Sequence, residues 1–337
     1  MISRKDFLRM GALGVAGLAL PKGLYSQNSS PIIGHGKFRY RVHQYWGGLD
    51  RSRYPIKDGH EMVVDRKGRI FLLTNETKNN IIIYDFRGRL IDTWGHEFPG
   101  GHGLSIKDEG GEEFLYICDY ERHEVIKTTL DGRVVMTISA PLDSGHYTSA
   151  DQFKPTETAI SESGDIYVAD GYGQQWISVF DQQGRLKQVF GGPEHFSNAH
   201  GISIDDRKAN SPTLLITARE QNMLKRFSLD GKWLKDIHLP GAFINRPVIS
   251  GKNVYLSVLK AASFPDAGSG FVVILDKKDR VVSCPGGSHP DSLDTVGLHQ
   301  TLRLFNHPHD VAVDRHKNLY IPQWNSNGVY PIMLERI

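Results

Sequence analysis

The chain has 337 residues, of which 39% are hydrophobic and 23% charged, enough to bury a large core in one big all-β domain or two smaller ones. Its net charge of +2, with no lysine or arginine run beyond the N-terminus, excludes the composition typical of nucleic-acid binding. Fifteen histidines against two cysteines favour imidazole and carboxylate chemistry over thiolate chemistry.

Residues 1–28 are predicted to be an export signal rather than part of the fold. Arg4 and Lys5 precede an apolar run from Met10 to Leu20, which is shorter than the roughly 20 apolar residues that a spanning helix needs. Residues 3–9 resemble the twin-arginine export motif, with Lys5 in place of the second arginine, so the ordinary secretory route stays open. We therefore expect no membrane span and a mature protein in the periplasm or outside the cell. The alternative is an amphipathic helix of the domain.

Residues 36–337 are predicted to form one domain from a repeated four-strand unit. Between residues 60 and 94, short apolar strands are joined by a turn at 65–68, a polar loop and a turn at 87–88. The pattern returns in 102–138, 156–190, 200–237 and 246–283, and in part in 309–335. Four short strands in about 40–50 residues are typical of a β-propeller blade, so five full units and one partial unit predict six blades.

The strand expected at 38–46 belongs to no unit, and the sixth unit ends without its fourth strand. We expect the strand at 38–46 to serve as the fourth strand of the sixth unit, which closes the ring and leaves no exposed sheet edge. The repeat resembles the six-bladed propellers built from NHL repeats, across essentially all of residues 38–337. A monomer is expected, with long loops at 141–153 and 284–305 over one face. Cys118 and Cys284 fall in different repeats, and we expect no disulfide between them.

Histidines recur at one phase of the repeat, where the strand that lines the channel begins. The six first strands start at His60, His102, Thr156, His200, Arg246 and His309. His102, His200 and His309 belong to alternate blades, which sets them roughly 120° apart around the axis of a six-fold ring. Three neutral imidazoles with an open position are the ligand set of a catalytic zinc site, and we predict Zn²⁺ there. The alternative is that each histidine caps its strand and bonds to the neighbouring blade.

The ends of the second strands should reach the same rim as these histidines. Tyr172 follows a glycine there, and a neighbouring cation would favour its ionised form, so we predict that it is a general base. Arg219 is predicted to hold a substrate carboxylate through a two-pronged contact. Substrate-binding roles are also predicted for His60, Arg246 and Lys260. The alternatives are a packed loop tyrosine and a solvated surface arginine.

Five segments resemble the signature segments of the peptidyl-α-hydroxyglycine amidating lyases, namely 101–106, 170–172, 199–204, 219–220 and 308–310. The resemblance implies that His102, His200 and His309 bind zinc, that Tyr172 is the base, and that Arg219 binds the substrate carboxylate. It also implies a structural Ca²⁺ in the channel, held by Asp310 and by the backbone carbonyls of Met62 and Leu104. His307, beside this last segment, is expected to be only a neighbour of the site.

The sequence also departs from that family. Where the family has a catalytic arginine after the second strand of the first blade, residues 73–76 read Leu-Thr-Asn-Glu, and the family's loop disulfides are missing. We therefore predict a zinc-dependent lyase that eliminates next to a carboxylate, preferably a dehydratase or lyase on uronic-acid-containing oligosaccharides in polysaccharide degradation. The alternatives are a peptidyl-α-hydroxyglycine amidating lyase and a non-catalytic binding propeller. The histidine-rich rim argues against a lactonase or esterase.

Overall fold

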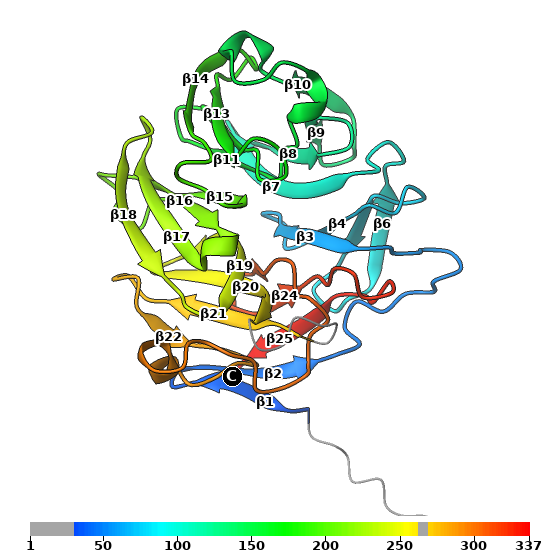
Figure 1. Cartoon of the computed structure of the whole chain (residues 1–337). Coiled ribbons are helices and arrows are strands. Elements are labelled where there is room, and N and C mark those ends of the chain that lie inside the picture. The colour runs from blue at the N-terminus through cyan, green and yellow to red at the C-terminus, as the bar shows by residue number, and fades with distance from the viewer. Residues whose placement is uncertain (1–29, 262–268) are drawn as a thin grey trace, which may run out of the picture. The chain divides into compact units, whose positions relative to one another are not determined.

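The computed structural model describes residues 30–261 and 269–337, and residues 31–337 form one compact unit. Within the described residues the regular structure is 25 β-strands and four short 3-10 helices, and the strands form six sheets set around a ring (Figure 1). The predicted six-bladed β-propeller is thus confirmed. The predicted export signal at 1–28 lies outside the described residues. No helix in the described part of the chain is long and apolar enough to cross a membrane.

Each of the first three blades is a four-stranded antiparallel sheet, as the repeat predicts. Blade one holds β3 (Gly59–Val64), β4 (Ile70–Thr74), β5 (Ile81–Tyr84) and β6 (Leu90–Trp94). Blade two holds β7 (Gly101–Glu109), β8 (Glu112–Asp119), β9 (Glu124–Thr129) and β10 (Val134–Ser139). Blade three holds β11 (Glu157–Ile160), β12 (Ile166–Ala169), β13 (Trp176–Phe180) and β14 (Leu186–Gly191). The loop between blades two and three carries η1 (Leu142–Ser144) and η2 (Ala150–Gln152).

Blades four to six continue the ring. Blade four holds β15 (Ala199–Asp205), β16 (Thr213–Ala218), β17 (Met223–Ser228) and β18 (Trp233–His238), with η3 (Arg219–Gln221) after β16. Blade five holds β19 (Ala242–Ser250), β20 (Asn253–Ala261), β21 (Phe271–Leu275) and β22 (Val281–Ser283), followed by a loop with η4 (Pro290–Asp294). Blade six holds β23 (Ala312–Val313), β24 (Leu319–Ile321) and β25 (Ile332–Arg336).

Two N-terminal strands, β1 (Ile32–His35) and β2 (Phe38–His43), complete blade six, whose sheet order is β1-β2-β25-β24-β23. β2 runs antiparallel to β25, with Tyr40 opposite Arg336, and is the predicted closing strand, although it ends at His43 rather than at residue 46. β1 adds a fifth strand that the sequence reading missed. The amide of His35 donates to the Ser283 hydroxyl at 2.8 Å, so β1 also contacts blade five.

The burial pattern follows from blades packed face to face. The inner strands are buried on both faces, as in β4, whereas the fourth strands β6 and β10 are largely exposed. The turns repeat an aspartate that accepts from the following backbone, such as Asp85 from the amides of Arg87 and Arg89. Gly88 in that turn has a φ of +78°, and a Cβ there would lie 1.7 Å from the Trp46 carbonyl oxygen. Only glycine fits this turn.

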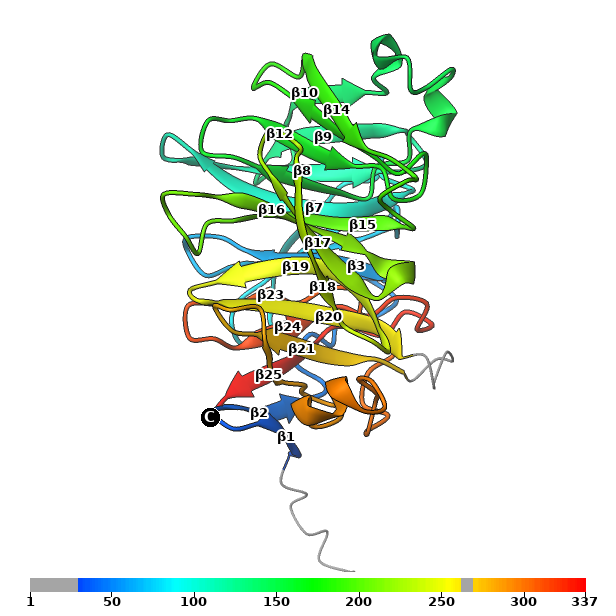
Figure 2. The same cartoon turned by 60° about the vertical axis from the view of Figure 1, so that its left-hand side comes forward.

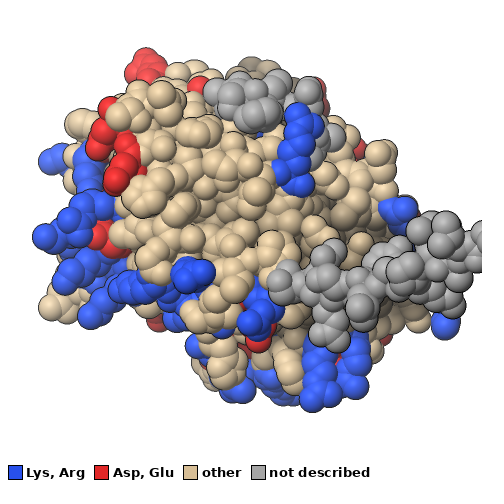
Figure 3. Space-filling view, turned by 90° about the horizontal axis from the view of Figure 1, so that it is seen from below, with Lys and Arg blue, Asp and Glu red and all other residues tan. Residues whose placement is uncertain are grey.

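The first strands β3, β7, β11, β15, β19 and β23 surround the central channel, and Figure 2 shows several of them crossing the thickness of the ring. On the side that carries β1, β2 and β22, lysines and arginines gather toward the edges, and the middle of the view is mostly uncharged (Figure 3). Cys118 and Cys284 are buried free thiols, which confirms that they form no disulfide.

Candidate metal centre

Four histidines meet at one end of the channel. His60 lies on β3, His102 on β7, His200 on β15, and His309 shortly before β23, and all four are buried. The ring of His102 lies 4.7 Å from those of His200 and His309, between centroids, and His200 lies 5.0 Å from His309. The structure therefore brings together the three histidines predicted as metal ligands, and it adds His60.

Backbone carbonyls orient two of these rings. The Nδ1 atom of His102 lies 2.9 Å from the carbonyl oxygen of Thr156, and that of His309 lies 3.0 Å from the carbonyl oxygen of His60. Because a carbonyl oxygen only accepts, each Nδ1 must carry the proton of the neutral ring, which leaves each Nε2 unprotonated. A second-shell hydrogen bond of this kind is the usual way in which proteins fix a metal-binding imidazole.

The electrostatic surroundings keep the imidazoles neutral. Burial lowers the pKa of His102, His200 and His309 well below the usual value, and for His200 the nearby charge of Arg219 acts in the same direction. Burial likewise lowers the pKa of His60 to about 3, with help from the charges of Lys57 and Arg219. Neutral imidazole is the form that binds metal, so no proton has to be removed when an ion enters.

Several of these ring nitrogens are buried without a hydrogen-bond partner among the described residues. They are both nitrogens of His60, Nδ1 of His200 and Nε2 of His309. An unpaired buried polar group costs about 1–3 kcal/mol, so the cluster is unfavourable unless something binds the nitrogens. One ring nitrogen each of His60, His102 and His309 lie within 4.8 Å of one another. The residues therefore fit a divalent transition-metal ion, for which imidazole is a suitable ligand.

Tyr172 stands over this cluster, as predicted. Its hydroxyl lies 3.1 Å from His102 Nε2 and 3.3 Å from His200 Nε2. The residue before it must be glycine, because a Cβ on Gly171 would lie 2.5 Å from the carbonyl oxygen of Ala199. Asp170 anchors the turn by accepting from the backbone amide of Gln174 at 2.6 Å, and burial raises the pKa of this carboxyl to about 6.

Arg219 begins η3 beside Tyr172 and is only 4% exposed. Its guanidinium donates to the side-chain oxygen of Asn245, and among the described residues it forms no ion pair with a carboxylate. Burial lowers the pKa of this guanidinium, while the neighbouring Tyr172 acts in the opposite direction. A buried cation without an anionic partner, next to the tyrosine and the histidines, is suited to receive an anionic substrate.

Arg246 corrects two predictions at once. Its guanidinium donates to the carbonyl oxygens of Leu104 (2.7 Å) and Met62 (3.0 Å) and to both carboxylate oxygens of Asp310 (3.1 and 2.6 Å). These are the oxygens predicted to hold Ca²⁺, so in this structure the arginine fork takes the place of that ion. The predicted substrate-binding role of Arg246 is wrong as well, because its donors are used inside the protein.

Two more buried carboxylates surround this arginine, and the sequence reading missed both. Glu61 and Glu157 approach the Arg246 guanidinium at 3.7 and 3.5 Å. Burial raises the pKa of both carboxyls, well above the usual value for Glu61. The sequence did contain a pattern that could have revealed them. Glu61, Glu157 and Asp310 are each the residue directly after a first-strand start, one position beyond the one at which histidines recur.

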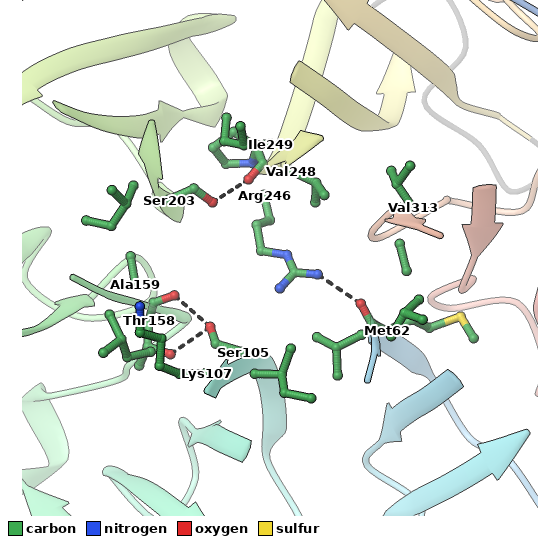
Figure 4. Close-up of a pocket in the computed structure, with 17 residues that line it drawn as sticks. Met62, Ser105, Lys107, Thr158, Ala159, Ser203, Arg246, Val248, Ile249 and Val313 are labelled. Carbon is green, nitrogen blue, oxygen red and sulfur yellow. Dashed lines mark hydrogen bonds between the residues drawn. The ribbon is translucent and has the colours of Figure 1, made fainter. Parts of the chain in front are cut away.

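A cavity of about 300 Å³ opens along the channel below this arginine (Figure 4). Arg246 reaches across it toward Met62, and Ser105 and Thr158 stand on the opposite wall. None of the four clustered histidines lines this cavity. The arginine and its carboxylates thus separate the histidine cluster from the cavity.

Lys260 and His307 each contact an aromatic ring. Lys260, near the end of β20, places its ammonium 4.9 Å from the centre of the Phe243 ring, and no contact within the described residues joins it to the histidines. Its predicted substrate-binding role stays a prediction. His307 packs with its ring 5.9 Å from that of Trp324 and is a neighbour, as expected.

No protein-family model matches the chain. It is 26% identical over 320 residues to peptidyl-alpha-hydroxyglycine alpha-amidating lyase 1 of Drosophila melanogaster, which covers 86% of this chain and 53% of that protein. It is 27% identical over 193 residues to a probable lyase of the same name from Caenorhabditis elegans, which covers 51% of this chain and 53% of that protein. The chain thus spans about half the length of these curated relatives, and it is similar to the amidating lyases, as its signature segments indicate.

Solved structures with the same fold have little sequence identity to this chain. A gluconolactonase from Xanthomonas campestris superposes with a TM-score of 0.64 at 11% identity, covering 91% of this chain and 95% of that one. A virginiamycin B lyase from Staphylococcus aureus superposes with a TM-score of 0.58 at 11% identity, covering 89% and 100%. At this identity the likeness shows the propeller fold alone.

Proposed function

We propose that the chain is a metal-dependent lyase that removes a proton next to a substrate carboxylate and expels an oxygen from the neighbouring carbon. The observation that carries this proposal is the Tyr172 hydroxyl, which lies within 3.3 Å of both His102 and His200 and beside the buried cation of Arg219. A base, a carboxylate receptor and a metal-binding cluster are the groups that such an elimination needs.

Arg219 receives the substrate carboxylate and stabilises the charge that develops on it. When the proton leaves the adjacent carbon, negative charge spreads into the carboxylate, and a buried guanidinium stabilises that charge more than a solvated one would. Asn245 accepts from the guanidinium and therefore fixes its direction. The substrate's reacting carbon is then set against Tyr172.

Tyr172 moves the proton. In its ionised form, its Oη accepts the proton from the carbon beside the carboxylate and becomes a hydroxyl, the bond from the next carbon to its oxygen breaks, and a carbon–carbon double bond forms. The same hydroxyl returns the proton to the departing oxygen, so the products are an unsaturated acid and water or an alcohol. His102, His200 and His309 would hold the metal, for which we propose zinc, and a bound ion supplies Lewis-acid polarisation of a substrate oxygen.

Uronic-acid oligosaccharides are the proposed substrate class. They carry a carboxylate beside a removable proton, with an oxygen on the next carbon, and the expected export signal would bring the enzyme to them. The position that corresponds to the amidating lyases' additional arginine supports this choice. There Asn75 accepts from the backbone amide of Asp58 at 3.1 Å and donates to its carboxylate, so residues 73–76 offer no counterpart of that catalytic arginine.

Amidating activity is the second candidate. It is supported by the 26% identity to the Drosophila melanogaster lyase over 86% of this chain. It is also supported by the clustering of the residues that the resemblance names, since His102, His200, His309, Tyr172 and Arg219 gather at one end of the channel. A non-catalytic binding propeller is the remaining candidate, and it predicts no turnover of either substrate.

Absorbance measurements test the proposal. The metal-loaded protein should convert uronate-terminated oligosaccharides to products with the ultraviolet absorbance of an unsaturated uronate, and Tyr172→Phe should lower the rate by about 10²–10⁴-fold because it removes the base. Tyr120→Phe is the matched control, because its ring lies 5.5 Å from that of Tyr172 and its hydroxyl has no role in the proposed step. Turnover of a hydroxyglycine peptide without any uronate product would overturn the substrate assignment in favour of amidation.

A further inference from the structure

His60 is the histidine of the cluster that the proposed three-ligand set leaves without a role. It is only 2% exposed, and its ring centroid lies 4.9 Å from that of His102 and 4.9 Å from that of His309. Neither of its ring nitrogens has a hydrogen-bond partner among the described residues. A neutral imidazole has one donor and one acceptor, so this ring leaves both unsatisfied, which is unfavourable for buried polar atoms.

The spacing of the ligand atoms places His60 around the same point as its neighbours. One ring nitrogen each of His60, His102 and His309 lie within 4.8 Å of one another. Nitrogens that share one ion at about 2.0–2.1 Å lie roughly 3.4 Å apart in a tetrahedral arrangement, so small side-chain rotations would close the set. His200 adjoins this group through ring distances of 4.7 Å to His102 and 5.0 Å to His309.

A direct substrate-binding role fits His60 less well. To attract a carboxylate by its charge the ring would have to be cationic, and it is buried beside other imidazoles, with no described carboxylate bonded to it. A core histidine held only by packing would still leave two buried polar nitrogens unpaired, which folded proteins rarely tolerate. A metal ion would satisfy one nitrogen of His60 together with the bare Nε2 of His309.

We propose that His60 is a fourth imidazole ligand, so that one divalent transition-metal ion is held by His60, His102, His200 and His309. This inference rests on the proposed metal-dependent function and adds a requirement to it. Four protein nitrogens complete a tetrahedral site, whereas a catalytic ion needs an open position. The ion must therefore accept at least five ligands, as zinc does in some states and as other first-row divalent metals commonly do.

Cobalt(II) binding to the full chain tests the proposal, because its visible absorption is weak with five or six ligands and intense when tetrahedral. The wild type should bind one cobalt per chain with weak absorption. His60→Ala should bind it at least tenfold more weakly, and the absorption band should become stronger because one ligand is lost. Added free imidazole should restore the wild-type spectrum. His307→Ala is the matched control, a buried histidine outside the cluster, and should leave affinity and spectrum unchanged.

The outcomes separate this inference from the function on which it rests. If His60→Ala keeps the wild-type affinity and spectrum while His102→Ala loses the metal, the fourth ligand is refuted and the three-ligand site stands. If the expected cobalt results are obtained but no substrate is turned over, the fourth ligand stands and the lyase proposal fails. A wild type that binds no metal overturns both. His60→Gln, with a thermal unfolding curve for each variant, guards against loss of metal by misfolding.

Discussion

Two buried arginines near the channel differ in whether a carboxylate of the protein neutralises their charge. Arg246 donates to Asp310 and lies within 4 Å of Glu61 and Glu157, so its charge is used within the fold. Arg219 has an amide partner, Asn245, and no carboxylate partner among the described residues. The sequence placed both at the rim with the same substrate-binding chemistry, because strand phase fixes where a residue starts but not which way a long side chain turns.

Arg219 is therefore expected to act on the substrate's carboxylate. Arg219→Gln should lower kcat/KM for a carboxylated substrate by about 10–10²-fold, the range for one lost charge-assisted contact. Arg219→Lys keeps the charge but not the two-pronged contact, so its kcat/KM should lie between those of the wild type and Arg219→Gln. Steady-state kinetics on the acid and on its methyl ester check this. Equal losses on the two substrates would show that Arg219 only supports the fold.

At the scale of the element, the repeat predicted more of the structure than any single motif did. Counting from the turns located the four strand starts that carry histidine, and the structure gathers all four, because equivalent first strands begin at one rim. The same counting could not show how deep in the channel each side chain lies, so it missed the role of Glu61 and Glu157, which are one residue beyond the strand starts. It also missed β1, which is short and has no equivalent in the other blades.

The end of β15 carries an ion-pair network whose effect depends on pH. Asp205 accepts from Arg207 at 2.7 Å and from Arg226 at 2.6 Å, and Arg207 also pairs with Asp279. Burial alone would raise the pKa of Asp205, but the hydrogen bonds and charges of the two arginines hold it at about 2. A carboxyl with a lowered folded-state pKa stabilises the protein above its unfolded pKa, and this stability is lost as pH falls through the folded value.

Asp205→Asn should therefore lower the free energy of unfolding by about 2 kcal/mol at pH 7, and the difference from the wild type should narrow as pH falls from about 4 toward 2. Denaturant unfolding at a series of pH values measures this. Asp181→Asn is the matched control, because its partner Arg185 is 76% exposed, and it should change the free energy of unfolding much less. A difference for Asp205→Asn that does not change with pH would count against the network.

At the scale of the whole molecule, the histidine cluster depends on ring closure. Its members come from blades one, two, four and six, and blade six is completed by β2 from the other end of the chain. The sequence could predict this closure, because a missing fourth strand and an unassigned strand are both visible in the pattern. It could not predict that an arginine would replace an ion at the centre, since that depends on the packing of five blades around one point.

Removing that arginine should make the fold depend on calcium. In Arg246→Met, the carboxylates of Asp310, Glu61 and Glu157 would lose their buried cation, which typically costs about 3–5 kcal/mol. The midpoint of thermal unfolding at pH 7 should then fall by about 10 °C, and by less at pH 5, because carboxyls without the arginine take up protons more readily. Arg246→Lys keeps a charge but not the forked guanidinium, so its unfolding midpoint should fall by less than that of Arg246→Met.

Calcium at about 1 mM should raise the unfolding midpoint of Arg246→Met and leave the wild type unchanged. The variant frees the carbonyl oxygens of Met62 and Leu104 along with the three carboxylates, which together form the oxygen-rich site that Ca²⁺ prefers. Calorimetric scans of both proteins with and without the ion measure the effect. A wild type stabilised as much as the variant would mean that Ca²⁺ binds elsewhere. Selective stabilisation of the variant would identify Arg246 as the built-in cation that joins the blades at the channel.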